Sequence, residues 1–298
     1  MGGALAWWGL SSVTQLSRIE HLFLTILPSV ALALTACRWS DPLLVVHDGG
    51  TDRNGGTDQS TSCSSQAGID ASGDLTEGLV AWYRCESAAG PSGTVLPDSS
   101  GHGNDGTLVT GAGGSPGYSF APGKVGNALD LTEANKGYAA LPAGLLANAC
   151  EATIATWVYI NSDSNAWARI WDFGNGTNAY MFLTRITNVD QLARFGITVG
   201  GSAHEELIKG QTAVPFRKWT HVAVVLDASG GTLYFDGAVA GTNSSMTLRP
   251  ADLGSTANNY IGRSQFSIDP YLEGSVDEFR IYNRALSPDE IQALANGS

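Results

Sequence analysis

Apolar and polar residues alternate in short runs along the chain from about residue 75 onward, and turn residues separate the runs. A period of two residues with β-branched and aromatic side chains is typical of half-buried strands. The pattern predicts strands over 79–85, 153–160, 169–173, 180–186, 194–199, 220–227, 232–235, 259–262 and 275–283. Helices do not alternate with these strands, so we expect an all-β fold, either a sandwich or a jelly roll.

Two local signals define the end of this domain more closely. The dipeptide Asp-Gly at 236–237 supplies the positive φ that a tight hairpin turn requires. Near the C-terminus, Ser287 offers an N-cap hydroxyl, Pro288 suits the first helical position, and Glu290 suits the third. We therefore expect a hairpin around 233–239 and one short C-terminal helix.

The first 36 residues have the pattern of an export signal. Residues 22–36 are mostly apolar, but a helix of this length spans only about 22 Å, short of a ~30 Å bilayer core. The tetrapeptide at 34–37 resembles the lipobox of bacterial lipoproteins, which implies acylation of Cys37 and membrane attachment through a lipid anchor only. In that case the protein lies at the cell envelope or surface. The alternative is a plain secretory signal, with Cys37 incidental and the protein secreted.

The segment at 37–74 is rich in Gly, Ser and Asp, and its part from residue 47 onward contains no aromatic residue. Such a composition buries too little apolar surface to offset its ordering entropy. We expect a flexible tether there, followed by a single domain over 75–298.

Composition and charge narrow the class of function. The chain carries 16 Lys and Arg against 28 Asp and Glu, for a formal net charge of −12. A nucleic-acid-binding protein normally has a basic face, so nucleic acid is not an expected partner. The 37 glycines and eight tryptophans, with only 15% charged residues, also suit a β-rich protein with many tight turns.

A series of short motifs resembles one family in order and spacing. The motifs are DSSGHGNDG at 98–106, VGNAL at 125–129, TIATWV at 153–158, KWTHVA at 218–223, LYFDG at 233–237, IGRS at 261–264, GSVDE at 274–278 and RALS at 284–287. Together they resemble the LamG-like jelly roll of the concanavalin A-like lectin/glucanase superfamily. The resemblance implies two curved antiparallel sheets and a module that is often non-catalytic and displayed on secreted or surface proteins.

The loop at 98–104 is a candidate calcium site. Ca²⁺ takes about six to eight oxygen ligands, and the glycines of this loop let Asp98 and Asn104 approach one point. In proteins that the chain resembles, such a loop lies near an acidic residue of the last long strand, here Asp277. We expect a structural Ca²⁺ held by these three residues and a carbonyl near His102. The alternative is an Asx turn, in which the side chains of the loop bind its own backbone.

Three cysteines remain if Cys37 is acylated. Cys85 and Cys150 both lie at strand ends within the domain, so an oxidising compartment predicts a disulfide between them. Cys63, in the tether, would then be a spare thiol or an intermolecular partner.

Aromatic and polar residues alternate around 165–180 and recur at 263–271. On a regular strand, Trp167, Arg169 and Trp171 would share one face. Sugars stack their apolar faces on aromatic rings and bind polar side chains through their hydroxyls. These residues, with Asn178, Tyr180 and Arg263, are the candidate ligand-binding set, although the tryptophans could instead be core residues.

Three classes of function are consistent with these features. The first is a non-catalytic surface module that binds a polysaccharide or glycoprotein, and the second is a structural or adhesive display domain. The third, a divergent glycoside hydrolase, needs two carboxylates across a cleft. The nearest candidates, at 273–278 and 204–206, lack the required spacing on one strand face, so we do not expect an enzyme.

Overall fold

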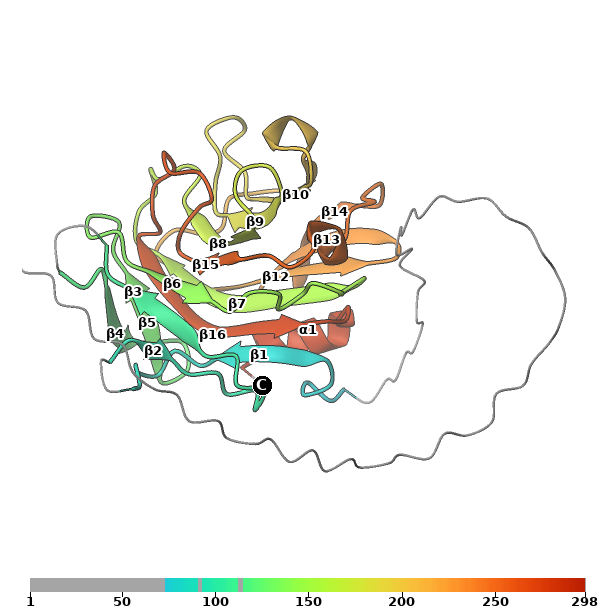
Figure 1. Cartoon of the computed structure of the whole chain (residues 1–298). Coiled ribbons are helices and arrows are strands. Elements are labelled where there is room, and N and C mark those ends of the chain that lie inside the picture. Colours follow the sequence, from blue (N-terminus) through green and yellow to red (C-terminus); the bar gives the residue numbers. More distant parts are fainter. Residues whose placement is uncertain (1–72, 91–92, 112–114, 298) are drawn as a thin grey trace, which may run out of the picture. The chain divides into compact units, whose positions relative to one another are not determined.

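The computed structural model describes residues 73–90, 93–111 and 115–297 (Figure 1). The predicted signal at 1–36 with Cys37, and the tether up to residue 72 with Cys63, lie outside the described residues. No helix in the described part of the chain has the length and apolar character needed to cross a membrane.

Two antiparallel sheets form the domain, as the family resemblance implies. Sheet A has the order β14 (Ala238–Asn243), β13 (Gly230–Phe235), β12 (Thr220–Asp227), β7 (Ala152–Ile160), β16 (Gly274–Tyr282), β5 (Asn127–Leu131) and β4 (Tyr118–Pro122), with β1 (Leu79–Tyr83) also pairing with β16. Sheet B has the order β11 (Glu206–Lys209), β10 (Arg194–Thr198), β9 (Tyr180–Thr184), β8 (Arg169–Gly174), β15 (Asn258–Ile261), β6 (Tyr138–Leu141), β3 (Gly106–Val109) and β2 (Val95–Leu96). The expected jelly-roll sandwich is confirmed.

One cluster of buried apolar side chains joins the inner faces of the two sheets. Val158 and Val224 enter it from sheet A, and Phe195 and Ile208 enter it from sheet B. Because side chains alternate between the faces of a strand, every second residue of these strands is left on an outer face. These residues form the outer faces of the two sheets.

The predicted hairpin and helix are both present. Asp236 and Gly237 have φ values of 49° and 83°, which places both in the left-handed region between β13 and β14. The helix α1 (Pro288–Ala295) begins with a capping box between Ser287 and Glu290. Its buried residues pack against the outer face of sheet A, so part of that face is covered.

The predicted disulfide between Cys85 and Cys150 is wrong. Cys85 is a free, buried thiol, and Cys150 is not free but has another partner. The strands β1 and β7 both pair antiparallel with β16, so they run in the same direction. Cys85 follows the end of β1, whereas Cys150 precedes the start of β7, and the two therefore lie toward opposite ends of the sheet. A disulfide requires Cα atoms within about 7 Å.

We expect the Cys85 thiol to resist alkylation in the folded protein. It is 2% exposed, and burial raises its pKa, so little reactive thiolate reaches the reagent. Peptide mass spectrometry after iodoacetamide treatment should show the Cys85 peptide unlabelled in buffer and labelled in denaturant. Recovery of a non-reduced peptide that joins Cys85 to Cys150 would contradict the fold described above.

Candidate functional site

The strand β8 begins with a β-bulge that changes which side chains face the core. Arg169 pairs with Thr184 of β9, but the next paired residue, Trp171, is opposite Leu183. Ile170 is therefore an extra residue on this strand, and the regular alternation is broken there. As a result Ile170 and Trp171 both enter the core, whereas Arg169 points to the outer face.

Trp171 is a core residue, contrary to its predicted place in the ligand-binding set. It is 1% exposed, and its ring centroid lies 5.4 Å from that of Phe173 and 6.0 Å from that of Phe195. The prediction that Trp171 shares a face with Trp167 and Arg169 is wrong because it assumed an unbroken period of two residues. The alternative of a core tryptophan is the one found.

The outer face of sheet B carries a continuous row of side chains. Strand pairing aligns Ala140, Tyr260, Asp172, Phe182 and Gly196 across β6, β15, β8, β9 and β10. A neighbouring row contains Arg169, Thr184, Arg194 and Lys209. This mixture of charged and aromatic residues on a sheet face differs from the apolar inner face, so we call it the sheet-B face and consider it the candidate site.

Trp167 lies half-buried at one end of the sheet-B face, beside two guanidinium groups. Its Nε1 donates to Oδ1 of Asn188 at 2.8 Å. The guanidinium carbons of Arg169 and Arg194 lie 5.5 and 5.3 Å from the ring centroid, within cation–π range. These four residues form the Trp167 cluster, which holds one face of an indole in a fixed orientation.

Arg194 is itself held by an acidic partner in the loop between β9 and β10. Its Nη2 lies 2.8 Å from Oδ2 of Asp190, and Nζ of Lys209 lies 3.3 Å from the same oxygen. A hydrogen bond from Thr187, helped by these cations, lowers the pKa of Asp190 to about 2. The carboxylate of Asp190 therefore stays ionised at neutral pH.

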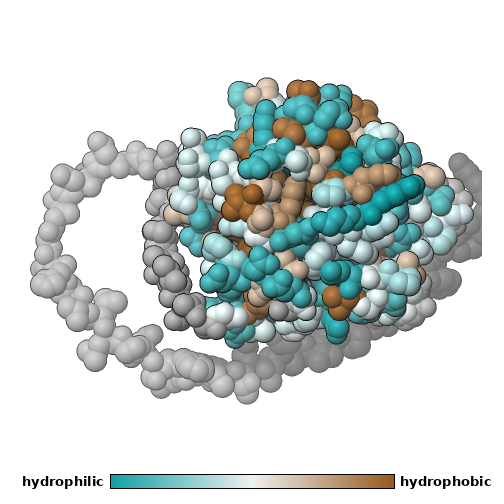
Figure 2. Space-filling model, turned by 180° about the vertical axis from the view of Figure 1, so that it is seen from behind, coloured by the Kyte–Doolittle hydropathy of each residue, from teal (hydrophilic) through white to brown (hydrophobic). Residues whose placement is uncertain are grey.

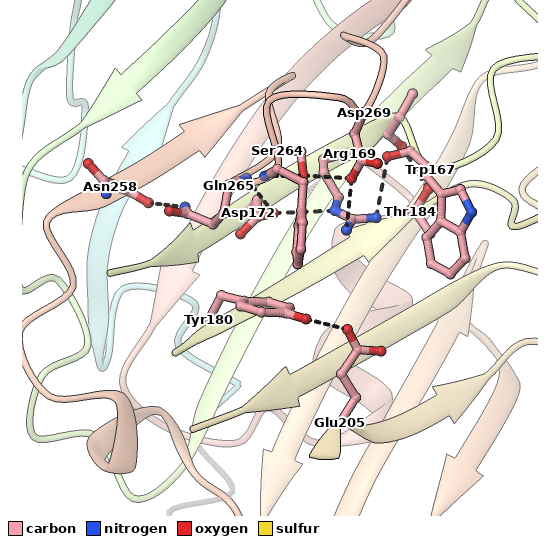
Figure 3. Close-up of polar contacts among 12 residues, drawn as sticks. Trp167, Arg169, Asp172, Tyr180, Thr184, Glu205, Asn258, Ser264, Gln265 and Asp269 are labelled. Atoms are coloured by element: carbon pink, nitrogen blue, oxygen red, sulfur yellow. Dashed lines mark hydrogen bonds and ion pairs between the residues drawn. The ribbon is translucent and has the colours of Figure 1, made fainter. Parts of the chain in front are cut away.

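Arg169 connects the Trp167 cluster to the middle of the face (Figure 3). Its Nε lies 3.2 Å from Oδ2 of Asp172, and its Nη2 lies 3.2 Å from Oδ2 of Asp269. Its Nη1 donates to the carbonyl of Trp167 at 3.3 Å, and its guanidinium lies 3.8 Å from the centroid of the Phe182 ring. Because Arg169 is only 2% exposed, it orders its neighbours and offers little surface to a ligand.

The contacts of Arg169 fix the loop at 262–273 on the sheet. The backbone N of Gln265 donates to Oδ2 of Asp172 at 3.1 Å, and Oγ of Ser264 donates to Oδ2 of Asp269 at 2.8 Å. Both carboxylates also bind Arg169. The loop is therefore tied to β8 at two points, and Ile268 near its tip is 90% exposed.

Asp172 is the buried acid of the face. It is 0% exposed, and burial raises its pKa to about 6 although Arg169 acts in the opposite direction. Its Oδ1 has no hydrogen-bond partner among the described residues. The carboxylate is thus enclosed between Arg169 and the loop and has no open path to solvent.

Tyr180 and Asn178 lie at the far end of β8 and β9. Tyr180 is on the predicted face but is fully buried, since Phe266 packs edge-on at 5.4 Å and its hydroxyl donates to Glu205 at 2.5 Å (Figure 3). Burial, with the bond to Glu205, raises the pKa of this phenol. Asn178 is exposed in the turn and donates to the carbonyl of Val199 at 3.3 Å.

Arg263 lies at the other end of the sheet-B face among three tyrosines. Its Nη1 donates to the hydroxyl of Tyr138 at 2.7 Å, and its guanidinium lies 4.7 and 4.6 Å from the rings of Tyr138 and Tyr260. Tyr138 packs edge-on against Tyr260 at 5.3 Å and lies 6.1 Å from Tyr271. These four half-buried residues form the tyrosine cluster.

Tyr138 and Tyr260 were absent from the predicted set. Each alternates with a buried residue, Ala139 in β6 and Ile261 in β15, so strand parity alone places both tyrosines on the outer face. For Tyr260, the alternation with the apolar residue Ile261 can be read from the sequence. For Tyr138 it was hidden because β6 is only four residues long and alanine-rich.

Comparison with known proteins identifies the family. The family model Laminin_G_3, described as the concanavalin A-like lectin/glucanases superfamily, matches residues 133–292. The chain belongs to this superfamily. Curated protein sequences gave no match.

Solved members of similar fold include modules and whole binding domains. Domain 4 of AbnA, a GH43 extracellular arabinanase from Geobacillus stearothermophilus solved with arabinotriose, has a TM-score of 0.60 at 23% identity and covers 73% of this chain and 98% of its own. The binding domain of botulinum neurotoxin serotype D/C has a TM-score of 0.56 at 14% identity, over 74% of this chain and 52% of its own. The Trypanosoma rangeli sialidase matches with a TM-score of 0.50 at 20% identity, over 73% and 32%. At these identities the likeness establishes the lectin/glucanase fold.

Asp98 and Asn104, two of the predicted calcium ligands, are bound by the backbone and side chains around their own loop. Oδ1 of Asp98 accepts from the backbone N of Trp82 and of Ser100, each at 2.9 Å. Oδ2 accepts from Oγ of Ser100 at 2.7 Å and from the backbone N of Asn104 at 2.9 Å. The side chain of Asn104 donates to the carbonyl of Val80 at 2.8 Å. These are the bonds of the Asx-turn alternative, and they occupy both oxygens of Asp98.

The other two predicted ligands do not complete a cation site. His102 is exposed in the loop, whereas Asp277 is buried beneath the turn between β4 and β5, where its Oδ2 accepts from the backbone N of Val125 at 2.9 Å. Within the described ranges, no group of three or more His, Cys, Asp and Glu side chains could hold a metal ion. The arrangement does not fit a calcium ion shared by Asp98, Asn104 and Asp277.

We expect chelation to leave the stability of the protein unchanged. Backbone and hydroxyl donors already satisfy Asp98, so removing divalent ions takes away no ligand bond in this loop. Thermal unfolding with EDTA and with excess CaCl₂ should give the same Tm, while Asp98→Ala should lower it. A Tm that rises by several degrees with calcium, and only when Asp98 is intact, would restore the calcium prediction.

Asp277 should weaken the domain at neutral pH. Burial, more than the nearby Glu278, raises the pKa of Asp277 to about 6, above the ~3.9 of an unfolded chain. A raised acid pKa means that the folded state gains stability as pH falls from about 6 to about 4. Asp277→Asn should therefore be about 2 kcal/mol more stable than the unmodified protein at pH 7, and this advantage should vanish near pH 4. Urea unfolding at both pH values tests this, and an equal effect at both would exclude the charge as the cause.

Three of the acidic residues considered for a glycosidase accept hydrogen bonds from the protein. Oε2 of Glu273 accepts from the backbone N of Glu133 at 2.7 Å, and Oε1 of Glu206 accepts from Thr247 at 2.6 Å. Glu205 accepts from Tyr180, as described above. Each of these three acids therefore has a structural partner.

Proposed function

We propose that the protein is a non-catalytic carbohydrate-recognition module whose ligand lies along the sheet-B face. The observation that carries the proposal is the pair of aromatic clusters at the two ends of that face, each built around a guanidinium group. Half-buried tyrosine and tryptophan rings offer stacking surfaces for the apolar faces of sugar rings. The polar groups beside them offer partners for hydroxyls.

The ordering of the face supports recognition of an extended oligosaccharide. The loop at 262–273 is tied down by Arg169, so the sheet-B face is held in one shape before a ligand arrives. Preorganisation lowers the entropy cost of binding. The tyrosine cluster, on β6 and β15, and the Trp167 cluster, beside β8 and β10, offer two contact points to a ligand of several sugar units, such as a polysaccharide or the glycan of a glycoprotein.

A hydrophobic docking function has less support. On the face drawn in Figure 2, hydrophobic residues occur in small groups between hydrophilic ones. Large apolar side chains exposed at the surface include Val189 and Ile268, at 72% and 90%, and both belong to loops of the sheet-B face. Isolated apolar residues at a rim are compatible with contacts to a sugar ligand and do not form a large apolar patch.

We also propose export and lipid anchoring of the mature chain. The sequence at 34–37 supports acylation of Cys37, which would display the domain at the end of the 37–74 segment. Mass spectrometry of the membrane fraction should find a lipidated N-terminal cysteine. Release of the Cys37→Ser variant into the soluble fraction is expected, and an unchanged membrane fraction would exclude this anchor.

The binding proposal is tested with the full chain on an array of oligosaccharides that includes arabino-oligosaccharides and sialylated glycans. Tyr260→Ala and Trp167→Ala should each weaken binding at least tenfold. Trp219→Ala is the matched control, because Trp219 is also half-buried and aromatic but packs on Tyr159 of sheet A. Equal loss in all three variants, or concentration-dependent self-assembly without any glycan signal, would favour the adhesive display alternative.

Hydrolysis by the same face is the other outcome to examine. Asp172 is enclosed and Asp269 is bound by Ser264 and Arg169, so neither is available to attack a sugar. Incubation of the bound oligosaccharide with the protein should leave it intact. If the protein released shorter products, and the Asp172→Asn variant did not, the glycosidase alternative would replace the binding proposal.

A further inference from the structure

A cavity of about 190 Å³ lies on the outer face of sheet A, on the other sheet from the proposed glycan site. Trp157 of β7 and His221 of β12 are paired neighbours that line it. Trp82 of β1 and Glu278 of β16 line it from the adjacent strands, and Leu294 of α1 contributes at one end. The cavity is polar and aromatic, and it is large enough for several waters or one small ring.

A strained residue aims its carboxylate into this cavity. Asp277 pairs with Trp157, but the next residue of β16 to pair with β7 is Arg280, opposite Ala155, so β16 carries a bulge at Glu278. Glu278 has φ 51°, a left-handed conformation that is strained for a non-glycine residue. Backbone strain of this kind concentrates at functional sites.

One oxygen of Glu278 is fully engaged and the other is not. Oε2 accepts from Nε1 of Trp82 at 2.8 Å and lies 2.8 Å from Nη2 of Arg280. Oε1 is buried and has no hydrogen-bond partner in the described part of the chain, with Nε of Arg84 3.7 Å away. A buried carboxylate oxygen without a donor is costly, so the cavity lacks a hydrogen-bond donor at this point.

His221 presents a second incomplete polar group. It is 2% exposed, its ring packs edge-on to Trp157 at 5.4 Å, and its Nδ1 lacks a partner among the described residues. Burial, helped by the nearby Arg280, lowers the pKa of His221 to about 4. The imidazole is therefore neutral at pH 7 and adds no charge to the cavity.

The charges around the cavity argue against a cationic ligand. Arg84 and Arg280 lie 5.4 and 4.5 Å from the ring of Trp82, and Lys124 lies 4.2 Å from the ring of Trp157. The rings of Trp82 and Trp157 thus already lie beside three positive charges, and the single negative charge of Glu278 offsets these only in part. A ligand that satisfies Glu278 must donate hydrogen bonds without bringing positive charge, and a hydroxyl does so.

We propose that this cavity is a second carbohydrate site, which binds one neutral sugar ring through hydroxyl contacts to Glu278 and His221, with Trp82 and Trp157 as part of its wall. The site rests on the proposed function, since it makes the same module bivalent. Because the two sites lie on the outer faces of different sheets, one molecule would bind two glycan segments at once. Such a module holds polysaccharide chains more tightly than either site alone.

The test uses saturation-transfer NMR of the full chain with the methyl glycosides of glucose, galactose and arabinose. At least one should give a signal, whereas cyclohexanol, a ring of similar size with a single hydroxyl, should give none. Glu278→Gln replaces the unpartnered acceptor, and Val125→Trp fills the mouth from a half-exposed turn residue that lines the cavity. Both variants should weaken binding at least tenfold, and the sheet-B variant Tyr260→Ala should leave it unchanged.

Three results would overturn the second site. The first is no signal with any methyl glycoside, which leaves the oligosaccharide array as a separate test of the sheet-B face. The second is binding that survives both cavity variants but is lost in Tyr260→Ala, since the sugar would then occupy the sheet-B face. The third is binding of glucuronate alone, which would assign the cavity to carboxylates and contradict the hydroxyl chemistry proposed here.

Discussion

Replacing Trp171 with alanine is expected to lower the free energy of unfolding by about 3–5 kcal/mol, the range found for large aromatic side chains removed from cores. Trp171 is 1% exposed and packs against Phe173 and Phe195 at the centre of sheet B. Its removal leaves a cavity that neighbouring strands cannot close without breaking their pairing. Urea unfolding followed by circular dichroism measures the loss.

Trp167→Ala is the matched comparison for Trp171→Ala. Trp167 is half-buried and keeps one hydrogen bond through its indole, to Asn188, so its removal should cost about 1 kcal/mol. The two variants should therefore separate, with stability lost in one and glycan binding lost in the other. If Trp171→Ala were as stable as Trp167→Ala but bound no glycan, Trp171 would belong to the site and the bulge in β8 would be wrong.

Arg169→Met is expected to destabilise the domain by about 3–5 kcal/mol, because it leaves the carboxylate of Asp172 buried without its cation. The two side chains are 3% and 0% exposed and lie 3.2 Å apart, so water cannot replace the guanidinium. Asp269 loses a partner as well, which frees one attachment of the loop at 262–273. Thermal unfolding should show the loss, and proteolysis should show earlier cleavage in the loop.

The double variant Arg169→Met with Asp172→Leu separates the buried charge from the rest of the network. Removing both members of a buried pair is often close to neutral, so most of the stability should return. The loop should remain loose, because Gln265 has lost its acceptor on β8. Glycan binding should therefore stay weak although the domain is folded. A double variant as unstable as Arg169→Met would mean that packing on Phe182, and not charge, is the main contribution of Arg169.

The sequence predicts the architecture well because the long strands are continuous runs of β-branched, aromatic and apolar residues. The strands β7, β12 and β16 have eight or nine residues each, and their apolar runs clearly predict buried β-strands. The turn at Asp236-Gly237 and the capping box at Ser287 depend on local chemistry that the sequence displays directly. Short strands such as β2 and β3 were missed because two to four residues carry too little pattern.

The candidate site was less predictable because it depends on two β-bulges. One extra residue at Ile170 sends Trp171 into the core and brings Arg169 out beside Asp172. Another at Glu278 turns a carboxylate toward Trp82. A bulge shifts every later side chain to the other face, and no local residue preference marks its position in this chain. The error over Cys85 has a similar origin, since the pairing order of β1, β16 and β7 is not encoded in any one segment.

Hydroxyl-radical footprinting of the full chain, with and without the oligosaccharide that binds best on the array, tests the sheet-B face most directly. Ligand should reduce oxidation of Tyr138, Tyr260 and Trp167, which lie at the two ends of the face, and leave Tyr159 and Trp219 of sheet A unchanged. Protection of Tyr159 and Trp219, with none at the tyrosine cluster or Trp167, would contradict the assignment of glycan recognition to this face.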